Sequence, residues 1–247
     1  MKFIATLMLL LLTSIQVILA QTPNDWYKKG ETAYNTQKYE EAIKLLDNAI
    51  NQKCQFMDKA YYIRGLAKQS TGKFQPAIDD INKAIELNPK DISYYLARGA
   101  NYAIVGKYEE ALLDYNKVIE TNGGTLTLYF NRGFVYVNLK QYDKALADFN
   151  KVIELNPQDK KAYNNRGSML FSLGKYQESI NDFDKTLEID PKFFYAYINK
   201  GRSLVALGLY EQAMDCFTKG EAINNTLVYH LDDKKKAQEA LNAVAPK

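Results

Sequence analysis

Apolar and polar residues follow one pattern along most of the chain, and the pattern repeats every 34 residues. Within residues 126–159, aromatic and small side chains recur three or four positions apart, which places them on one face of an α-helix. The register of the repeat is marked by Gly30, Gly65, Gly99, Gly133, Gly167 and Gly201, with only the first interval being 35 residues. The periodicity predicts six helical hairpins, at about 23–57, 58–91, 92–125, 126–159, 160–193 and 194–226.

Each recurring position has a physical role in such a hairpin. A glycine inside the first helix removes the Cβ that would hold the second helix away, and its cost of about 1 kcal/mol relative to alanine implies a packing gain. A small residue four positions before a large apolar one puts both side chains on one face of the second helix. Pro89, Pro157 and Pro191 lack an amide hydrogen and end that helix. No hairpin buries its apolar stripe alone, so the hairpins must stack.

These residues resemble the signature of the tetratricopeptide repeat (TPR) family. The leading aromatic residue is Trp26, Tyr61, Tyr95, Tyr129, Tyr163 and Tyr197. The small residue of the second helix is Ala42, Ala77, Ala111, Ala145, Ser179 and Ala213, and the large one after it is Leu46, Ile81, Tyr115, Phe149, Phe183 and Phe217. The resemblance implies an all-α fold: a right-handed α-solenoid superhelix across residues 21–226, with a C-terminal capping helix and tail at 227–247.

Residues 1–20 are expected to be a signal peptide. Lys2 supplies the charged start, Ile4–Leu12 is apolar apart from Thr6, and Ala20 is a small residue at the expected cleavage point. The alternative is an uncleaved membrane anchor, but the polar residues of Thr13–Gln16 dilute the segment, and spanning needs about 20 mostly apolar residues. We therefore expect an exported protein, periplasmic or secreted, with membrane tethering by an uncleaved segment as the alternative.

The junctions between hairpins carry their own signals. Residues 53–58 hold the one-residue insertion, which predicts an irregular turn after the first hairpin. Gly123 and Gly124 replace the usual Asn-Pro sequence after the third hairpin and predict a helix C-cap with positive φ. At the start of the array, Thr22, Asn24 or Asp25 can cap the first helix.

The residue before each repeat glycine follows a separate rule. It is arginine in four repeats, and an aspartate then lies fifteen residues after the glycine: Arg64 with Asp80, Arg98 with Asp114, Arg132 with Asp148, and Arg166 with Asp182. It is lysine in the first and sixth repeats, where the aspartate is replaced by Leu45 or Cys216. Arginine pairs with a carboxylate through two parallel hydrogen bonds and lysine does not. We therefore expect structural Arg–Asp pairs between helices, rather than a row of ligand-binding arginines.

Composition and isolated reactive residues narrow the possible functions. The chain has 32 Lys and Arg against 29 Asp and Glu, which argues against an electrostatic nucleic-acid binder. Cys54 and Cys216 belong to the first and sixth hairpins, too far apart for a disulfide, so both are expected to be free thiols. The lone His230 lacks partners for a metal site or a catalytic triad. We expect no enzyme activity, no catalytic residue, no metal and no cofactor.

The remaining function is binding. In the TPR family the first helices line a concave groove, and the resemblance assigns particular places of each repeat to it. The candidate partner-binding residues are Tyr62, Leu96, Thr127, Phe130, Asn131, Phe134, Lys161, Asn164, Asn165, Tyr195, Ile198 and Arg202. Phe130 and Phe134 would give the groove an apolar centre, which suits an extended peptide or an amphipathic helix. The alternative is that both rings only pack between hairpins.

Some family members grip the C-terminal carboxylate of a peptide with lysine, asparagine and arginine side chains from three repeats. Asn131 and Lys161 match two places of that clamp, but Asn165 replaces its arginine. Leu96 and Ala100 replace its first pair. The clamp is incomplete, so this type of binding is not expected.

Three functions remain open on the sequence. We expect first a non-enzymatic scaffold that binds a protein or peptide partner in the groove. The second is a structural subunit of an envelope or secretion assembly, using its convex face or ends without a peptide ligand. The third is a membrane-tethered adaptor, if the N-terminal segment is retained. The Phe134→Glu change separates the first two, because it would abolish partner capture but leave assembly intact.

Overall fold

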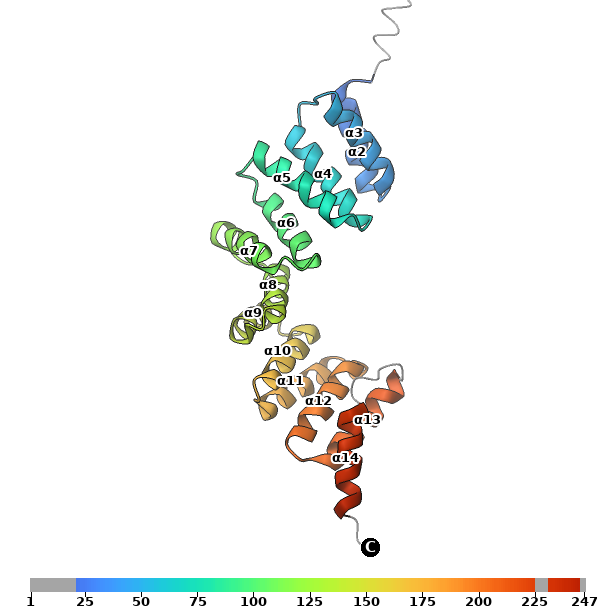
Figure 1. The fold of residues 1–247 in the computed structure, drawn as a ribbon, viewed down its shortest axis with the longest axis vertical. Helices are drawn as coiled ribbons and strands as arrows, with labels where there is room; N and C mark the ends of the chain where they lie inside the picture. The colour runs from blue at the N-terminus through green and yellow to red at the C-terminus, as the bar shows by residue number, and fades with distance from the viewer. Residues whose placement is uncertain (1–20, 225–230, 245–247) are drawn as a thin grey trace, which may run out of the picture. The chain divides into compact units, whose positions relative to one another are not determined.

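The computed structural model describes residues 21–224 and 231–244, where all regular secondary structure is helical (Figure 1). The helices are α2 (Pro23–Asn35), α3 (Tyr39–Asn51), α4 (Met57–Ser70), α5 (Phe74–Leu87), α6 (Ile92–Ile104), α7 (Tyr108–Asn122), α8 (Leu126–Asn138), α9 (Tyr142–Leu155), α10 (Lys160–Ser172), α11 (Tyr176–Ile189), α12 (Phe194–Ala206), α13 (Tyr210–Ile223) and α14 (Leu231–Val244). The predicted all-α class is confirmed. The expected signal peptide at 1–20 and His230 lie outside the described residues.

The helices form a solenoid of stacked hairpins. Helix α2 packs on α3, α4 on α5, α8 on α9, α10 on α11, and α12 on α13. Second helices also pack on the first helix of the next hairpin, as α3 on α4, α5 on α6, α9 on α10 and α11 on α12. Some first helices of successive hairpins also touch each other: α2 touches α4, α4 touches α6, and α10 touches α12. Among the described residues, the second helices make at most marginal contacts with each other. The first helices therefore lie on the inner side of each curved stack.

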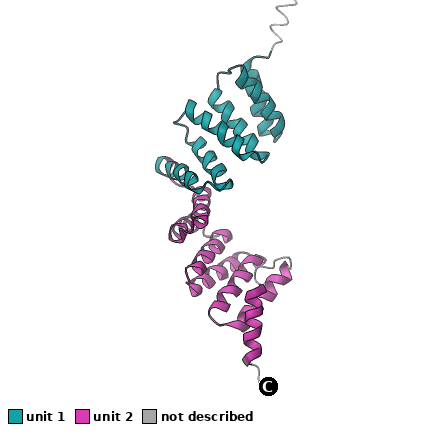
Figure 2. Cartoon of the chain, in the orientation of Figure 1, with its two compact units in different colours: residues 1–121 teal, residues 122–247 magenta. Residues whose placement is uncertain are grey.

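The chain divides into two compact units, residues 1–121 and 122–247 (Figure 2). The division falls at the end of α7, beside the two glycines that replace the usual turn. Gly123 has a φ of +77°, so the predicted C-cap with positive φ is confirmed there. Gly124 has a different role: an added Cβ would lie 2.1 Å from Cζ of Tyr129, so only glycine allows that ring to pack against the turn.

Local signals explain where the helices begin and end. Thr22 caps α2 through a capping box with Asp25, which confirms one of the predicted caps. Pro89 and Pro157 each lie one residue beyond the C-cap of a second helix. Lys53 has a φ of +55° in the inserted turn after α3, which agrees with the irregular turn predicted there.

The turn inside each hairpin needs one residue in the left-handed region. Four hairpins place a glycine there, with φ between +75° and +79°: Gly72, Gly106, Gly174 and Gly208. The first and fourth hairpins use Gln37 and Lys140 instead, with φ of +61° and +56°. A residue with a Cβ pays a cost of about 1 kcal/mol or more for this conformation, so these two turns are strained.

The repeat glycines allow the two helices of a hairpin to approach closely. A Cβ added at Gly167 would lie 2.8 Å from Cε1 of Phe183, and one at Gly201 would lie 2.5 Å from Cε1 of Phe217. Both phenylalanine side chains are fully buried. Burying such a ring contributes roughly 1.5–3 kcal/mol, which exceeds the helix-propensity cost of the glycine.

All four predicted Arg–Asp pairs are confirmed. In each, Nε and Nη2 of the arginine on the first helix donate to the two carboxylate oxygens of the aspartate on the second helix, at 2.6–2.8 Å. The aspartates are buried, whereas the arginines are only partly buried. Each pair therefore joins the two helices of one hairpin by a bidentate bond at the edge of the core.

The same arginines also reach the preceding hairpin. Nη1 of Arg64 donates to Asp47 at 2.6 Å, and Nη1 of Arg166 donates to Asn150 at 2.8 Å. In the sixth hairpin, Lys200 makes this backward contact, to Asp184, while its own hairpin has Cys216 in place of the aspartate. We call the four Arg–Asp pairs the Arg–Asp ladder. An arginine of this ladder that bonds both to its own aspartate and to the preceding hairpin joins helices of two hairpins.

Helix α14 caps the last hairpin, as the sequence predicted. It packs on α13 and touches α12, and Ala237 is fully buried in the core that these helices form. Lys234 donates to Glu221 of α13 at 2.6 Å. The start of the predicted helix, residues 227–230, lies outside the described residues. Within the part of the chain that is described, the helices lack the length and apolar character needed to cross a bilayer.

Both cysteines are free, as predicted, and both are buried. Cys54 packs in the core of the first hairpin and Cys216 in that of the sixth. Burial raises the pKa of both thiols. A raised pKa lowers the fraction of reactive thiolate at neutral pH, so these thiols serve packing rather than chemistry.

Candidate functional site

Most of the predicted groove residues lie on the first helices of the second unit, α8, α10 and α12. Residues at intervals of three and four on a helix share one face. Thr127, Phe130, Asn131 and Phe134 follow this spacing on α8, and Lys161, Asn164 and Asn165 follow it on α10. Because first helices lie on the inner side of the stack, this face is the candidate binding surface.

The two phenylalanines of α8 have different surroundings. Phe130 is half-buried, and its ring meets that of Phe149 on α9 edge to face, with centroids 5.8 Å apart. Phe134 is 52% exposed. Packing within its own hairpin therefore accounts for Phe130, while Phe134 presents an apolar ring to solvent.

Asparagine amides border this ring along the face. Asn131 and Asn165 are half-buried, and neither side chain has a hydrogen-bond partner among the described residues. Asn164 accepts a long hydrogen bond of 3.4 Å from Asn199 of α12. Thr127 and Lys161 are exposed. The face thus combines an apolar centre with amide groups that can both donate and accept.

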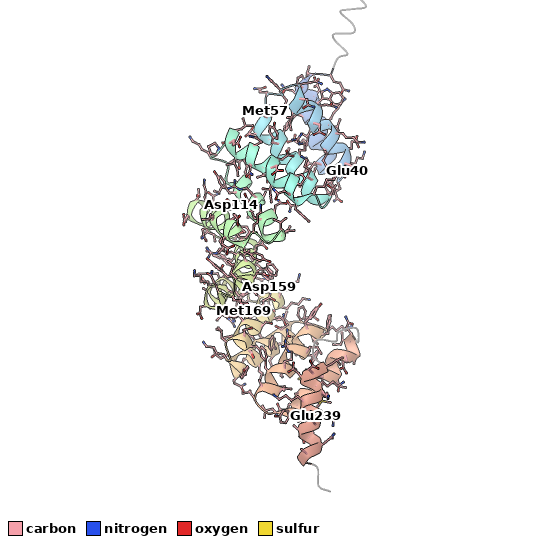
Figure 3. The ribbon with its side chains drawn as sticks, in the orientation of Figure 1. Glu40, Met57, Asp114, Asp159, Met169 and Glu239 are labelled. Carbon is pink, nitrogen blue, oxygen red and sulfur yellow. The ribbon has the colours of Figure 1, made fainter. Side chains whose placement is uncertain are left out.

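A small pocket lies between α10 and α12, on the same face. Its volume is about 160 Å³, and it is lined by Ser168, Met169, Phe171, Ser172, Phe183, Asn199 and Arg202. We call it the α10–α12 pocket; Met169 marks its place on α10 in Figure 3. Pockets for small-molecule ligands occupy about 300–1,000 Å³, so this one has room for a single side chain.

Arg202 closes one side of the α10–α12 pocket. Its guanidinium lies over the ring of Phe171, 5.0 Å from the centroid. Its Nε donates to Oδ2 of Asp233 on α14, at 2.9 Å. The predicted groove residue is thus engaged by an acid from the C-terminal helix of the same chain.

One predicted groove residue was wrong. Ile198 is only 1% exposed, because it packs in the core against Phe217 and Ala213, beneath Gly220. A buried side chain is unavailable to a partner. Its neighbour Tyr195 is exposed and packs against the rings of Phe193 and Phe194 at the start of α12.

Two further predicted residues belong to the first unit. Tyr62 on α4 packs on Tyr94 of α6 with centroids 4.7 Å apart, and burial raises its pKa. Leu96 on α6 is exposed. Tyr62 therefore contributes to the contact between hairpins, whereas Leu96 remains on the surface.

Two residues of the site were not predicted from the sequence. Asn199 occupies the same repeat position as Asn131 and Asn165, so the 34-residue register could have identified it. Asp233 lies outside the repeats, and no periodic signal marks it. The described residues contain no group of three or more His, Cys, Asp or Glu side chains arranged to hold a metal ion.

Stacked hairpins with an exposed inner face define a helical-repeat scaffold of the α-solenoid class. Models of the tetratricopeptide repeat match residues 58–91, 127–159, 161–193 and 194–226. The chain belongs to the tetratricopeptide repeat family. No curated protein matches it in sequence.

Solved structures of other proteins share this fold. YrrB, a TPR protein with an unusual peptide-binding site, is 25% identical, with a TM-score of 0.66 over 77% of this chain and 97% of that chain. MamA is 21% identical, with a TM-score of 0.63 over 77% of this chain and 97% of that chain. MamA from Desulfovibrio magneticus RS-1 is 19% identical, with a TM-score of 0.65 over 70% of this chain and 99% of that chain. Both MamA structures support the fold alone.

Proposed function

We propose that this chain is a non-enzymatic scaffold that binds a peptide or helix segment along the inner face of α8, α10 and α12. The exposed ring of Phe134 is the observation that carries the proposal. It lies on the face where a solenoid presents its first helices, whereas Phe130 of the same helix packs on Phe149 within the hairpin. YrrB, which has the same fold, has a peptide-binding site.

The energetics favour Phe134 as the centre of such an interface. Burying a phenylalanine side chain against a partner contributes roughly 1.5–3 kcal/mol, equivalent to about a ten- to hundredfold change in affinity. Aromatic anchors at the centre of an interface supply a large share of binding energy. Single exposed apolar side chains are common on protein surfaces, so a specific binding surface also needs polar groups beside the ring.

The amides of Asn131 and Asn165 supply the polar part of the surface. An extended peptide carries one N–H and one C=O per residue, and each needs a partner once it leaves water. An asparagine side chain can satisfy both groups, because it carries a donor and an acceptor. This arrangement binds a peptide backbone with little dependence on side-chain sequence.

We also propose that the mature protein is exported and lacks residues 1–20. The proposal rests on the charged start and apolar core of that segment. Intact-mass measurement of the protein from its native host tests it. Loss of residues 1–20 excludes a tethered adaptor, and retention of the full mass contradicts export by a cleaved signal.

Selection from a display library of random dodecapeptides tests the binding proposal. Peptides selected on the full chain are synthesised, and their affinity is measured by fluorescence anisotropy. Phe134→Glu should weaken binding at least about tenfold, since it removes an apolar anchor and places a charge there. Its helical circular dichroism should match that of the unmodified protein.

Leu155→Glu is the matched control. Leu155 is 54% exposed against 52% for Phe134, and it belongs to the same hairpin, but it lies on the second helix. Its substitution should leave the affinity unchanged. Equal binding by Phe134→Glu and the unmodified chain would contradict the proposal and favour use of another surface.

A further inference from the structure

We propose that the α10–α12 pocket recognises a carboxylate of a peptide ligand beside an apolar side chain, and that Asp233 of the C-terminal helix holds the place of that carboxylate in the free protein. The inference rests on the proposed function, since it takes the inner face of the second unit as the peptide-binding surface. It adds the chemistry of the ligand and an internal competitor for it.

The position of Arg202 favours an acidic ligand. Its guanidinium lies over Phe171 in the wall of the pocket, and Nε already donates to a carboxylate, that of Asp233. A guanidinium on an aromatic face is well placed to pair with a planar carboxylate.

The remaining lining of the pocket favours an apolar neighbour to the acid. Phe171 supplies apolar surface, and Met169 and Phe183 lie buried behind it. The hydroxyls of Ser168 and Ser172 and the amide of Asn199 complete the lining. A volume of about 160 Å³ has room for one side chain and excludes a larger molecule. An Asp or Glu next to an apolar residue satisfies both parts of the site.

The bond between Arg202 and Asp233 is suited to exchange. The two side chains are 33% and 32% exposed, whereas the aspartates of the ladder pairs are at most 7% exposed. A partly exposed ion pair of this kind changes an equilibrium by only roughly two- to fivefold. A ligand carboxylate can therefore replace Asp233 without a large penalty.

Helix α14 has attachments that do not involve Asp233. Ala237 is buried in the core of the last hairpin, and Lys234 bonds to Glu221 of α13. Asp233 lies in the first turn of the helix, where its side chain can turn away while these contacts remain. The C-terminal helix thus caps the solenoid and also competes with ligand at one end of the groove.

The test compares the full chain with three variants: Arg202→Gln, Asp233→Ala and Lys234→Gln. Each is panned against the same random dodecapeptide library, and the frequency of Asp and Glu in the selected peptides is counted. A peptide selected on the unmodified chain is then made with an amidated C-terminus, alongside an analogue whose acid is replaced by the corresponding amide. A third peptide is the same acid-to-amide analogue, made with a free C-terminal carboxylate in place of the amidated C-terminus.

Acidic residues should be enriched on the unmodified chain, more strongly on Asp233→Ala, and not on Arg202→Gln. The selected peptide should bind Asp233→Ala about two- to fivefold more tightly than the unmodified chain. Its amide analogue should bind all forms weakly and equally. Recovery of affinity by the version with a free C-terminus would identify a terminal carboxylate as the source of the charge.

Lys234→Gln is the control for a general loosening of α14. It removes one attachment of the helix but leaves Asp233 on Arg202, so affinity should not rise. If Asp233→Ala lowers the melting temperature and leaves peptide affinity unchanged, Asp233 is only a structural anchor and the inference fails. Peptide binding that depends on Phe134 but shows no acid preference would also overturn it, while leaving the proposed function in place.

Discussion

Arg132 on α8 holds the buried carboxylate of Asp148 on α9 through two hydrogen bonds, Nε to Oδ2 at 2.8 Å and Nη2 to Oδ1 at 2.6 Å. Asp148 is 3% exposed on its side chain, so the pair is largely removed from water on the acidic side. Hydrogen bonding to this carboxylate raises the pKa of Arg132 above its ordinary value. The same geometry recurs at Arg64, Arg98 and Arg166 and gives the array its repeated cross-link.

Arg132→Ala should destabilise the protein by about 3 kcal/mol, because it leaves Asp148 buried without a counter-charge. Urea unfolding followed by circular dichroism measures the effect. The control is Lys151→Ala, since Lys151 and its partner Glu154 are both more than half exposed and such pairs contribute little. If the two variants unfold at the same urea concentration, the ladder has no role in stability.

Lys140→Gly should stabilise the fourth hairpin by up to about 1 kcal/mol. Lys140 occupies the left-handed turn where four other hairpins have glycine, and glycine adopts this φ without strain. The reciprocal change, Gly174→Lys, should destabilise by a similar amount. A Cβ at Gly174 would meet nothing within 4 Å, so any loss there reports backbone conformation alone. Unaltered melting temperatures in both variants would show that this turn carries no strain.

Asp58 should make the junction of the second and third hairpins sensitive to acid. Burial opposes ionisation of its carboxyl, but hydrogen bonds from Asn88 at 3.1 Å and Tyr94 at 2.9 Å outweigh burial and lower its pKa below the ordinary 3.8. A depressed pKa contributes stability that is fully present well above pH 3.8 and is lost as pH falls through the folded-state value.

Thermal melting from pH 7 down to pH 2.5 checks this expectation with Asp58→Asn as the comparison. At pH 7 the variant should melt at a lower temperature, because it loses charged hydrogen bonds to Tyr94 and Asn88. The gap between the two proteins should narrow below about pH 4 as Asp58 takes up a proton. A gap that stays constant with pH would assign the loss to packing instead.

The stabilising effect of an Arg–Asp pair can be tested by introducing one into the sixth hairpin. This hairpin has Lys200 and Cys216 where the four pairs have arginine and aspartate. Cys216→Asp alone should destabilise by about 1–3 kcal/mol, since it buries an acid without its partner. Adding Lys200→Arg should recover at least about 1 kcal/mol beyond additivity, because the pair can then form. A double-mutant cycle in urea measures the coupling, and a coupling near zero would contradict the bidentate geometry as the source of stability.

Much of the fold was predictable because its contacts are local and repeated. Gly167 and Phe183 are separated by less than one repeat, so a single motif contains both partners of the contact, and six copies in phase remove ambiguity. The pairing of arginine with aspartate was predictable for the same reason, because both residues lie within one repeat. The left-handed turn glycines Gly72, Gly106, Gly174 and Gly208 also recur in this register, and they were available as a further signal for the boundary between helices.

The candidate site was predictable only in part. A repeat position specifies which face of a helix a residue occupies, but the exposure of its side chain depends on what packs beside it. Ile198 and Phe130 hold the same repeat position, yet the first is buried in the core of the last hairpin and the second is half-buried on an aromatic ring. The local pattern could not distinguish them.

The sequence by itself determined the helical hairpins, their register and the pairing of arginine with aspartate, because each depends on residues within one period of 34. The tertiary structure decided which rings remain on the surface, as with Phe134, and which acid reaches Arg202. Asp233 comes from a helix outside the repeats, so only the packing of α14 on the last hairpin brings its carboxylate to that guanidinium. Contacts of this kind depend on three-dimensional proximity, which a periodic pattern does not encode.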